Sequence, residues 1–117
     1  MNSDRVVLIT GSASGIGTAL VDRFLCNNDT AIGTDLHKDV LERWRGRWPQ
    51  DAKLVPGAAD VRSEEDGERV ARLVRERFGR LDVLANRAGC FPILGFEAMP
   101  TAQSRHIINV DGGSVKH

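Results

Sequence analysis

Apolar residues along this chain follow two alternating patterns. Residues 5–10, 30–34, 53–56 and 81–86 form short, mainly apolar runs. Such runs are typical of parallel strands that are covered on both faces, whereas a strand with one solvated face alternates apolar and polar positions. The pattern therefore predicts four buried strands.

The segments between these runs have helical periodicity. Apolar side chains recur every three or four positions in residues 15–27 and 39–47 and from Ser63 to Gly79. Ser63 is a predicted N-cap, Gly79 a predicted helix end, and Pro49 a predicted stop for the second helix. In the first helix we expect the buried face to comprise Ile16, Leu20, Val21, Phe24 and Leu25, with Cys26 as a small buried side chain. In the second helix it should comprise Val40, Leu41, Trp44 and Trp48, and in the third Val70, Leu73, Val74 and Phe78.

A glycine-rich segment, residues 10–17, joins the first predicted strand to the first predicted helix. Glycine lets the backbone turn tightly and approach a ligand closely. A helix that begins here directs its free N–H groups and the positive end of its dipole toward the loop, as a pyrophosphate requires. We therefore expect the phosphate-binding residues to be Gly11, Ser14, Gly15, Ile16 and Gly17.

Asp35 stands eighteen residues after Gly17, at the end of the second predicted strand. A carboxylate there accepts hydrogen bonds from ribose hydroxyls, and its charge repels a 2′-phosphate, so the cofactor is expected to be NAD rather than NADP. His37 and Lys38 lie nearby and weaken that preference slightly. The alternative, a solvent-exposed aspartate after a simple Gly/Ser turn, is disfavoured by the strand–loop–helix context.

The alternation of strands and helices predicts the fold class. It favours a parallel sheet with helices on both faces, an α/β, Rossmann-like three-layer sandwich. Right-handed crossovers and a reversal after the third strand give the strand order 3-2-1-4. We expect residues 1–117 to form one domain that binds the cofactor across the carboxyl ends of the first and fourth strands.

Composition excludes several other classes of function. The 117 residues include sixteen basic and sixteen acidic side chains, which argues against a nucleic-acid or anionic-membrane partner. No apolar run is long enough to span a bilayer, and residues 1–4 carry no signal-peptide pattern. Two cysteines and three dispersed histidines predict neither a disulfide framework nor a metal site. We expect a reducing, cytoplasmic setting.

The spacing Gly-x3-Gly-x-Gly, preceded by Thr10, resembles the short-chain dehydrogenase/reductase family. Asp60-Val61 and residues 81–89 resemble two further motifs of that family, with Arg87 in place of a small or polar residue in its N-N-A-G turn. The resemblance covers residues 5–89 and implies an oxidoreductase that transfers hydride between an alcohol or carbonyl compound and NAD. It also implies that Asp60 and Val61 flank the adenine, and that Asn86, Ala88 and Gly89 approach the nicotinamide-side ribose.

The catalytic half of that family has no counterpart here. Its members are usually about twice as long and use a serine with a Tyr-x-x-x-Lys pair, in which the tyrosine passes a proton and the lysine lowers its pKa. This chain contains no tyrosine, and Ser104, Ser114 and Lys116 do not reproduce the arrangement. Asp82 and Glu97 are not a predicted acid–base pair. We therefore assign no catalytic residue and expect cofactor binding without efficient turnover.

Residues 106–117 admit two interpretations within the family. In one they resemble the helix after the fourth strand, and Asn109 and Gly112 match its asparagine-x-x-glycine, which makes Asn109 the counterpart of a catalytic asparagine. In the other, which we favour, they resemble the family's final strand with its terminal V-D-G-G. The second interpretation implies a truncated domain in which the middle of the fold is missing.

An open edge on strand 81–86 follows from that truncation. An exposed parallel edge is a template for pairing, so we expect the terminal strand to dock there or two chains to associate. The apolar segment 90–96 is expected to form an exposed patch. Three functions compete: an NAD-dependent oxidoreductase, a non-catalytic NAD-binding or regulatory module, and a deletion product without independent function.

Overall fold

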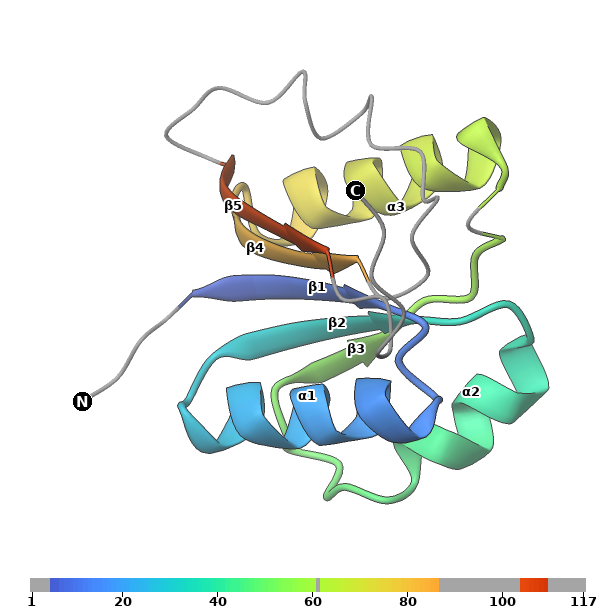
Figure 1. Cartoon of the computed structure of the whole chain (residues 1–117), viewed down its shortest axis with the longest axis vertical. Coiled ribbons are helices and arrows are strands. Elements are labelled where there is room, and N and C mark those ends of the chain that lie inside the picture. The colour runs from blue at the N-terminus through green and yellow to red at the C-terminus, as the bar shows by residue number, and fades with distance from the viewer. Residues whose placement is uncertain (1–4, 61, 87–103, 110–117) are drawn as a thin grey trace.

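The computed structural model of the chain describes residues 5–60, 62–86 and 104–109. Five strands and three helices follow one another along these residues (Figure 1). Their bounds are β1 (Val6–Thr10), α1 (Gly15–Cys26), β2 (Thr30–Thr34), α2 (Lys38–Arg45), β3 (Leu54–Pro56), α3 (Glu64–Arg77), β4 (Leu81–Asn86) and β5 (Ser104–Asn109).

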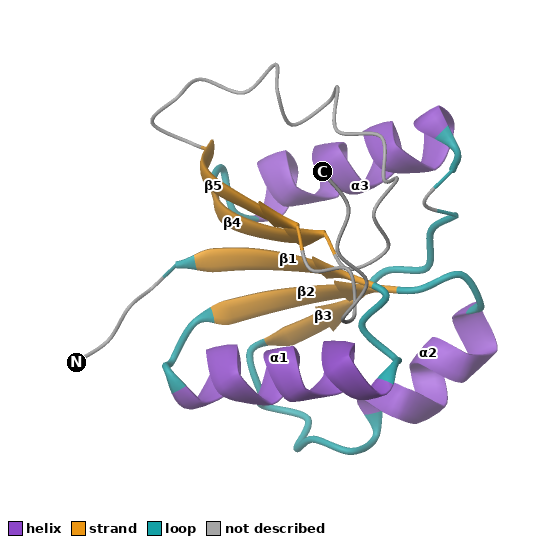
Figure 2. Cartoon of the chain, viewed as in Figure 1, coloured by secondary structure: helices purple, strands orange, loops and turns teal. Residues whose placement is uncertain are grey.

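The strands form one parallel sheet in the order β3-β2-β1-β4-β5. Helices α1 and α2 cover one face of the sheet and α3 covers the other, which gives three layers (Figure 2). The predicted Rossmann-like fold and the order 3-2-1-4 are therefore confirmed. The two crossovers after β1 and β2 run toward one edge, and the chain then returns through α3 to the opposite side of β1.

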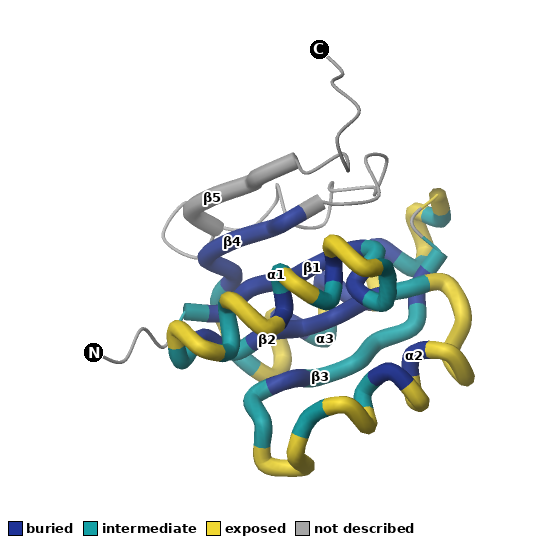
Figure 3. The backbone as a smooth tube through the Cα atoms, turned by 60° about the horizontal axis from the view of Figure 1, so that its bottom comes forward, coloured by how far each residue is buried: buried dark blue, intermediate teal, exposed yellow. Residues whose placement is uncertain are grey.

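Two hydrophobic clusters fill the space on either side of the sheet. Leu8 and Ile32 pack with Val74 of α3, whereas Val7 and Ile9 pack on the other face with Val21 of α1. Alternate residues of one strand thus reach opposite clusters, and β1 is buried along its whole length (Figure 3). Burial of both faces explains why the strand sequences are continuous apolar runs rather than alternating ones.

Three side chains that we expected in the core are on the surface. Ile16 is 40% exposed and Val40 is 38% exposed, and the thiol-bearing Cys26 is also exposed. In α1 the fully buried positions are Gly17 and Val21, four residues apart. Because successive helical residues are rotated by about 100°, Ile16 and Cys26 fall outside the stripe that these two positions define. In α2, Leu41 and Trp44 define the inner face and leave Val40 beside it.

The helix ends follow local signals with one shift. Ser63 Oγ accepts the Asp66 N–H at 3.1 Å and so caps α3, and Gly79 adopts φ 71° after its end, as predicted. Helix α2 ends at Arg45 instead of residue 47, with Gly46 as its C-cap. Pro49 therefore lies beyond the helix that we expected it to stop.

Two buried aspartates fasten the amino ends of the strands. Asp29, just before β2, accepts two hydrogen bonds from Arg5 at 3.1 and 3.0 Å, which raises the pKa of that guanidinium. Asp82 at the start of β4 accepts the Val6 N–H at 2.8 Å and two bonds from Arg80. Asp82 therefore joins β4 to β1, and its role at this edge is structural. Glu97 lies outside the described residues.

The C-terminal segment contributes the fifth strand. Residues Ser104–Asn109 run parallel to β4, with Leu81 opposite Ser104 and Asn86 opposite Asn109. This pairing agrees with the favoured strand interpretation and with the expected docking against strand 81–86. The predicted apolar patch at 90–96 lies outside the described residues. No helix within the described ranges is long and apolar enough to cross a membrane.

Candidate functional site

The glycine-rich loop lies at the carboxyl edge of the sheet, between β1 and α1. Gly11 has a φ of 62°, a conformation that side chains other than glycine rarely adopt. Ser14 is the N-cap of α1: its hydroxyl donates to the Gly11 carbonyl at 2.8 Å and accepts the Gly17 N–H at 3.0 Å. One serine thus closes the turn and opens the helix.

The other two glycines of the loop meet different surroundings. A Cβ on Gly17 would stand 2.2 Å from the Gly11 carbonyl oxygen and 2.7 Å from Ser12 Cα. A Cβ on Gly15 would meet no atom within 4 Å. Gly17 therefore permits the helix to pack against its own loop, whereas Gly15 leaves the outer surface of the helix start open to a ligand.

The first turn of α1 offers free donors at that open surface. Within the part of the chain that the structure describes, the N–H groups of Gly15 and Ile16 have no acceptor, and both residues are exposed. The first turn also contains no acidic side chain that would offset the helix dipole. Free N–H groups and an uncompensated positive dipole end are the features with which helix termini hold phosphate groups.

Asp35, at the carboxyl end of β2, is brought against the loop. Its Oδ2 accepts the Ala13 N–H at 3.0 Å and its Oδ1 accepts the Leu36 N–H at 2.8 Å. The carboxylate is partly exposed, and in the described ranges no ion pair joins it to Lys38 or His37. Each carboxylate oxygen has a second lone pair, so Asp35 retains capacity to accept hydrogen bonds from a ligand.

Asp60 lies on the segment after β3, at the same edge of the sheet. Its carboxylate accepts the Arg62 N–H at 2.9 Å and is paired with the Arg62 guanidinium at 3.3 Å, and these bonds hold the pKa of Asp60 below its usual value. Arg62 is thus the partner of both Asp60 carboxylate oxygens, and contact of Asp60 with an adenine stays a prediction. Val61, the neighbour predicted with it, lies outside the described residues.

The nicotinamide side of the predicted site is defined by backbone position. Asn86 is the last residue of β4, in register with Thr10 of β1 and with Asn109 of β5, and Thr10 is in register with Thr34. The carboxyl ends of four adjacent strands therefore finish on polar residues. Ala88 and Gly89 lie outside the described residues.

A hydrogen-bonded connection from α2 to the loop is a feature that the sequence did not indicate. Trp44 Nε1 donates to Thr18 Oγ1 at 3.0 Å, and that hydroxyl donates to the Ser12 carbonyl at 3.3 Å. The Trp44 ring also lies over Gly33, where a Cβ would be 2.7 Å from the ring and 2.8 Å from Ser12 Oγ. A glycine within a strand often marks such a close approach, and this was the available signal.

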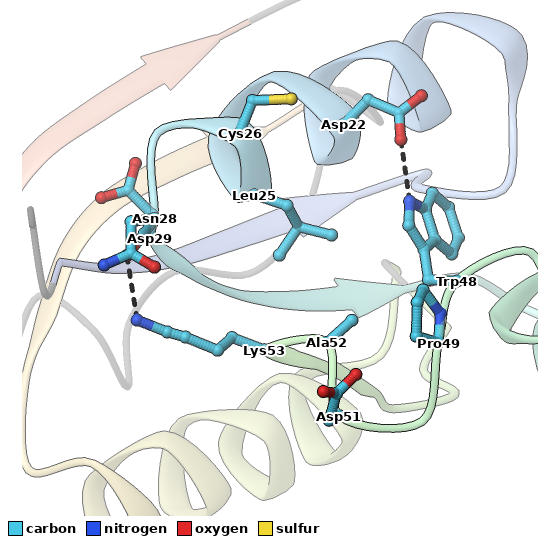
Figure 4. Close-up of a pocket in the computed structure, with 10 residues that line it drawn as sticks. All are labelled: Asp22, Leu25, Cys26, Asn28, Asp29, Trp48, Pro49, Asp51, Ala52 and Lys53. Carbon is cyan, nitrogen blue, oxygen red and sulfur yellow. Dashed lines mark hydrogen bonds between the residues drawn. The ribbon is translucent and has the colours of Figure 1, made fainter.

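A separate pocket of about 380 Å³ opens at the opposite, amino edge of the sheet (Figure 4). Within it Trp48 donates to Asp22 at 2.7 Å, and Lys53 donates to the Asn28 carbonyl at 3.0 Å. Cys26 lines the pocket with a free thiol. Searched over the described residues, the chain shows no cluster of histidine, cysteine or acidic side chains able to hold a metal.

The loop, the carboxylate after β2 and the parallel sheet together define a dinucleotide-binding fold of the Rossmann type. The chain belongs to the short chain dehydrogenase family, whose sequence pattern it matches over residues 5–115. This match extends past the segment 5–89 in which the motifs were found and includes β5.

Individual relatives support the assignment. The chain is 40% identical over 84 residues to 3-hydroxyacyl-CoA dehydrogenase type-2 of Bos taurus, which covers 72% of this chain and 31% of that protein. It is 31% identical over 115 residues to acetoacetyl-CoA reductase of Allochromatium vinosum, covering 95% of this chain and 46% of that protein. The chain thus spans less than half the length of both curated relatives.

A solved structure shows the same architecture. A 3-ketoacyl-(acyl-carrier-protein) reductase from Brucella melitensis, determined in complex with NADH, superposes with a TM-score of 0.65 at 32% identity, covering 73% of this chain and 34% of that chain. The similarity in fold therefore covers about three quarters of this chain and about a third of the Brucella reductase.

Proposed function

We propose that this chain binds NAD(H) as a short-chain dehydrogenase-type protein. The observation that carries the proposal is the pairing of two free N–H groups, those of Gly15 and Ile16, with a carboxylate at Asp35 on the same edge of the sheet. A pyrophosphate fits the first feature and a ribose diol fits the second. The open space around Gly15 supports the same assignment, because a phosphate must approach the backbone closely.

The preference for NAD over NADP rests on Asp35. A 2′-phosphate would bring a second negative charge against a carboxylate that the Ala13 and Leu36 N–H groups already hold in place. Ser12 and Ala13 supply no cation to offset it. The Brucella relative was determined with NADH, which agrees with this preference without testing it in the present chain.

Bound NAD would supply a hydride acceptor, but we propose that this chain alone turns over poorly. The sequence has no tyrosine to move a proton to or from a substrate oxygen. Two observations bear on Asn109. Its position in a strand agrees with the terminal-strand interpretation, whereas the acetoacetyl-CoA reductase match, which covers 95% of this chain within 46% of that protein, agrees with the catalytic-asparagine interpretation.

A second candidate function, a non-catalytic NAD-binding or regulatory module, rests on the same site and on the missing tyrosine. An assay of NADH oxidation over a panel of carbonyl compounds separates the two functions. We also propose that β5, as an edge strand, allows association with a second copy or with a longer relative, which sedimentation would detect as a concentration-dependent mass. The reducing, cytoplasmic setting stays a prediction.

Isothermal titration with NADH and NADPH tests the proposed function. Wild-type protein should bind NADH more tightly than NADPH. Asp35→Ala should weaken NADH binding by about 1.5–3 kcal/mol, because it removes a charged acceptor of ribose hydrogen bonds. The same variant should show a smaller difference between its affinities for NADH and NADPH. Asp39→Ala, at an exposed position in the first turn of α2, is the matched control and should bind as wild type does. Unchanged NADH affinity in Asp35→Ala would show that the ribose assignment is wrong.

A further inference from the structure

The phosphate-binding loop is held from behind as well as closed from within. We propose that Trp44 is a positioning residue for the dinucleotide site, acting through Thr18 on Ser12 so that the loop is already set for a phosphate. This inference rests on the proposed NAD(H) binding. It assigns a role in cofactor affinity to a side chain that lies behind the loop, in the core between α2 and the sheet.

The first step is a continuous chain of hydrogen bonds. The Trp44 indole donates to Thr18 Oγ1 at 3.0 Å, and the Thr18 hydroxyl donates in turn to the Ser12 carbonyl at 3.3 Å. A hydroxyl has one donor and two acceptor positions, so Thr18 can do both at once. A hydroxyl that accepts from the indole is also a better donor to the carbonyl, because hydrogen bonds in series polarise one another.

The second step is steric. Trp44 is 5% exposed and Ser12 is fully buried, and a Cβ on Gly33 would stand 2.7 Å from the Trp44 ring and 2.8 Å from Ser12 Oγ, so both side chains use the space that Gly33 leaves free. The Ser12 N–H and hydroxyl both donate to the Thr34 carbonyl, at 3.0 and 3.1 Å. Ser12 is therefore held by hydrogen bonds to β2 on one side and to Thr18 on another, and the Trp44 ring lies beside it over Gly33.

The third step connects Ser12 to the ligand-facing groups. Ser12 follows Gly11, the turn residue with positive φ, and precedes Ala13, whose N–H holds the Asp35 carboxylate at 3.0 Å. A displacement of Ser12 would move that N–H and the start of α1 together. Losing the Trp44 donor should therefore loosen both the phosphate donors and the ribose acceptor, although Trp44 touches neither.

Trp48 provides an internal control. Its indole N–H also donates to a side chain of α1, Asp22, at 2.7 Å, and its ring contacts that of Trp44 with a centroid separation of 4.8 Å. Asp22 is exposed and one turn farther from the loop than Thr18. Trp48→Phe therefore removes the same kind of bond from the same helix while it leaves the hydrogen bonds from Trp44 through Thr18 to Ser12 in place.

The test compares NADH affinity and thermal stability in Trp44→Phe, Thr18→Val, their double variant and Trp48→Phe. Trp44→Phe and Thr18→Val should each weaken NADH about three- to tenfold, the effect of one hydrogen bond. The double variant should lose little more than the larger single loss, because both changes break one chain of bonds. Trp48→Phe should bind NADH as wild type does, and its ligand-free melting temperature should fall less than that of Trp44→Phe, because its bond to Asp22 is exposed.

Fluorescence adds a readout that a purely structural role would not move. Trp48→Phe leaves Trp44 as the single tryptophan of the sequence. Its emission should change on addition of ADP, which carries the phosphates without a nicotinamide, whereas Trp48 emission in Trp44→Phe should not. Unchanged NADH affinity in both Trp44→Phe and Thr18→Val would overturn this inference alone. The inference would also be overturned if the losses of NADH affinity in the two single variants multiplied in the double variant and followed the fall in melting temperature. Failure of wild type to bind NADH would overturn the proposed function and this inference together.

Discussion

Two glycines of the loop, Gly15 and Gly17, differ in the space around them. Gly17 faces the backbone of Gly11 and Ser12 at distances that leave no room for a methyl group, whereas Gly15 faces open space. The two glycines belong to one sequence motif and would be scored alike by pattern matching. In the structure they have different surroundings, so substitutions at the two positions should have different effects.

Alanine substitutions should act on different properties at these two glycines. Gly17→Ala should destabilise the fold by about 1–3 kcal/mol, because backbone must move to admit the Cβ. Gly15→Ala should leave the stability of the free chain unchanged or slightly raised, since alanine favours the helix, and should weaken NADH at least tenfold. Chemical denaturation and titration of both variants measure the two effects. Equal loss of stability in both would contradict the division.

The motifs made most of the loop residues predictable, because a strand, a glycine turn and a helix start are neighbours in sequence. Asp35 was predicted from its spacing, and the structure places its Oδ2 3.0 Å from the Ala13 nitrogen, whereas its ribose role stays a prediction. Ile16 and Cys26 were wrongly placed in the core, since the apolar pattern of α1 does not set its rotation to within one residue. The Trp44 connection depends on two helices and a strand meeting, and no local pattern encodes that.

At the scale of elements, the start of α3 is joined to the segment that precedes it. Ser63 caps the helix, and the Asp66 carboxylate reaches back to accept the Asp60 N–H at 2.8 Å. That bond, together with the ion pair to Arg69, holds the pKa of Asp66 below its usual value. The arrangement fixes the position of Asp60 at the carboxyl edge through the helix that follows it.

Acid should weaken this junction in a defined pH range. A carboxyl whose pKa is lower in the folded than in the unfolded chain contributes stability that is present above its unfolded pKa, about 4, and is lost as the pH falls through its folded pKa. Asp66→Asn should therefore reduce the loss of stability below pH 4 while lowering stability at pH 7. Glu68→Gln, at an exposed position of the same helix, is the control. Unfolding curves at several pH values measure the free energy of unfolding of both variants. Identical pH profiles for Asp66→Asn and wild type would refute the stabilising role of the Asp66 carboxylate.

At the scale of the whole molecule, the carboxyl and amino ends of the strands carry different sets of polar residues. The carboxyl edge presents the loop, Asp35 and Asp60, whereas the amino edge is fastened by Asp29 and Asp82. Because the edges are at opposite ends of the strands, a change at the amino edge should alter stability without altering the cofactor site. This separation is the expected form for an α/β fold, in which ligands bind at the carboxyl ends of the strands.

Removing Asp82 tests that separation. Asp82→Ala should destabilise the chain by about 1–3 kcal/mol, because the Val6 N–H and the Arg80 guanidinium lose their buried acceptor. NADH affinity should be unchanged at temperatures where the variant is folded. Asp51→Ala, at an exposed position in the connection before β3, serves as the control. A large loss of NADH affinity in Asp82→Ala at full folding would contradict the independence of the two edges.

The layered fold was predictable at this scale because β1 to β4 are apolar runs that alternate with the amphipathic helices α1 to α3. Strand bounds for β2 and β4 agreed with the expected residues. The end of α2 was less predictable, since from Gly46 to Trp48 the N–H groups bond to carbonyls three residues back, before Pro49 is reached. The sequence allowed two interpretations of residues 106–117, and the long-range pairing of Ser104–Asn109 with β4 agrees with the strand interpretation over those residues.

A thermal melt of the purified chain with and without NADH tests the central claim most directly. Ligand that binds only the folded state at a hundred times its Kd adds about 2.7 kcal/mol, which raises the melting temperature by on the order of 10 °C for a chain of this size. We predict one cooperative transition that moves upward with NADH, moves less with the same concentration of NADPH, and moves less with NADH in Gly15→Ala than in wild type. A transition that NADH leaves in place would contradict the assignment of this edge as a dinucleotide site.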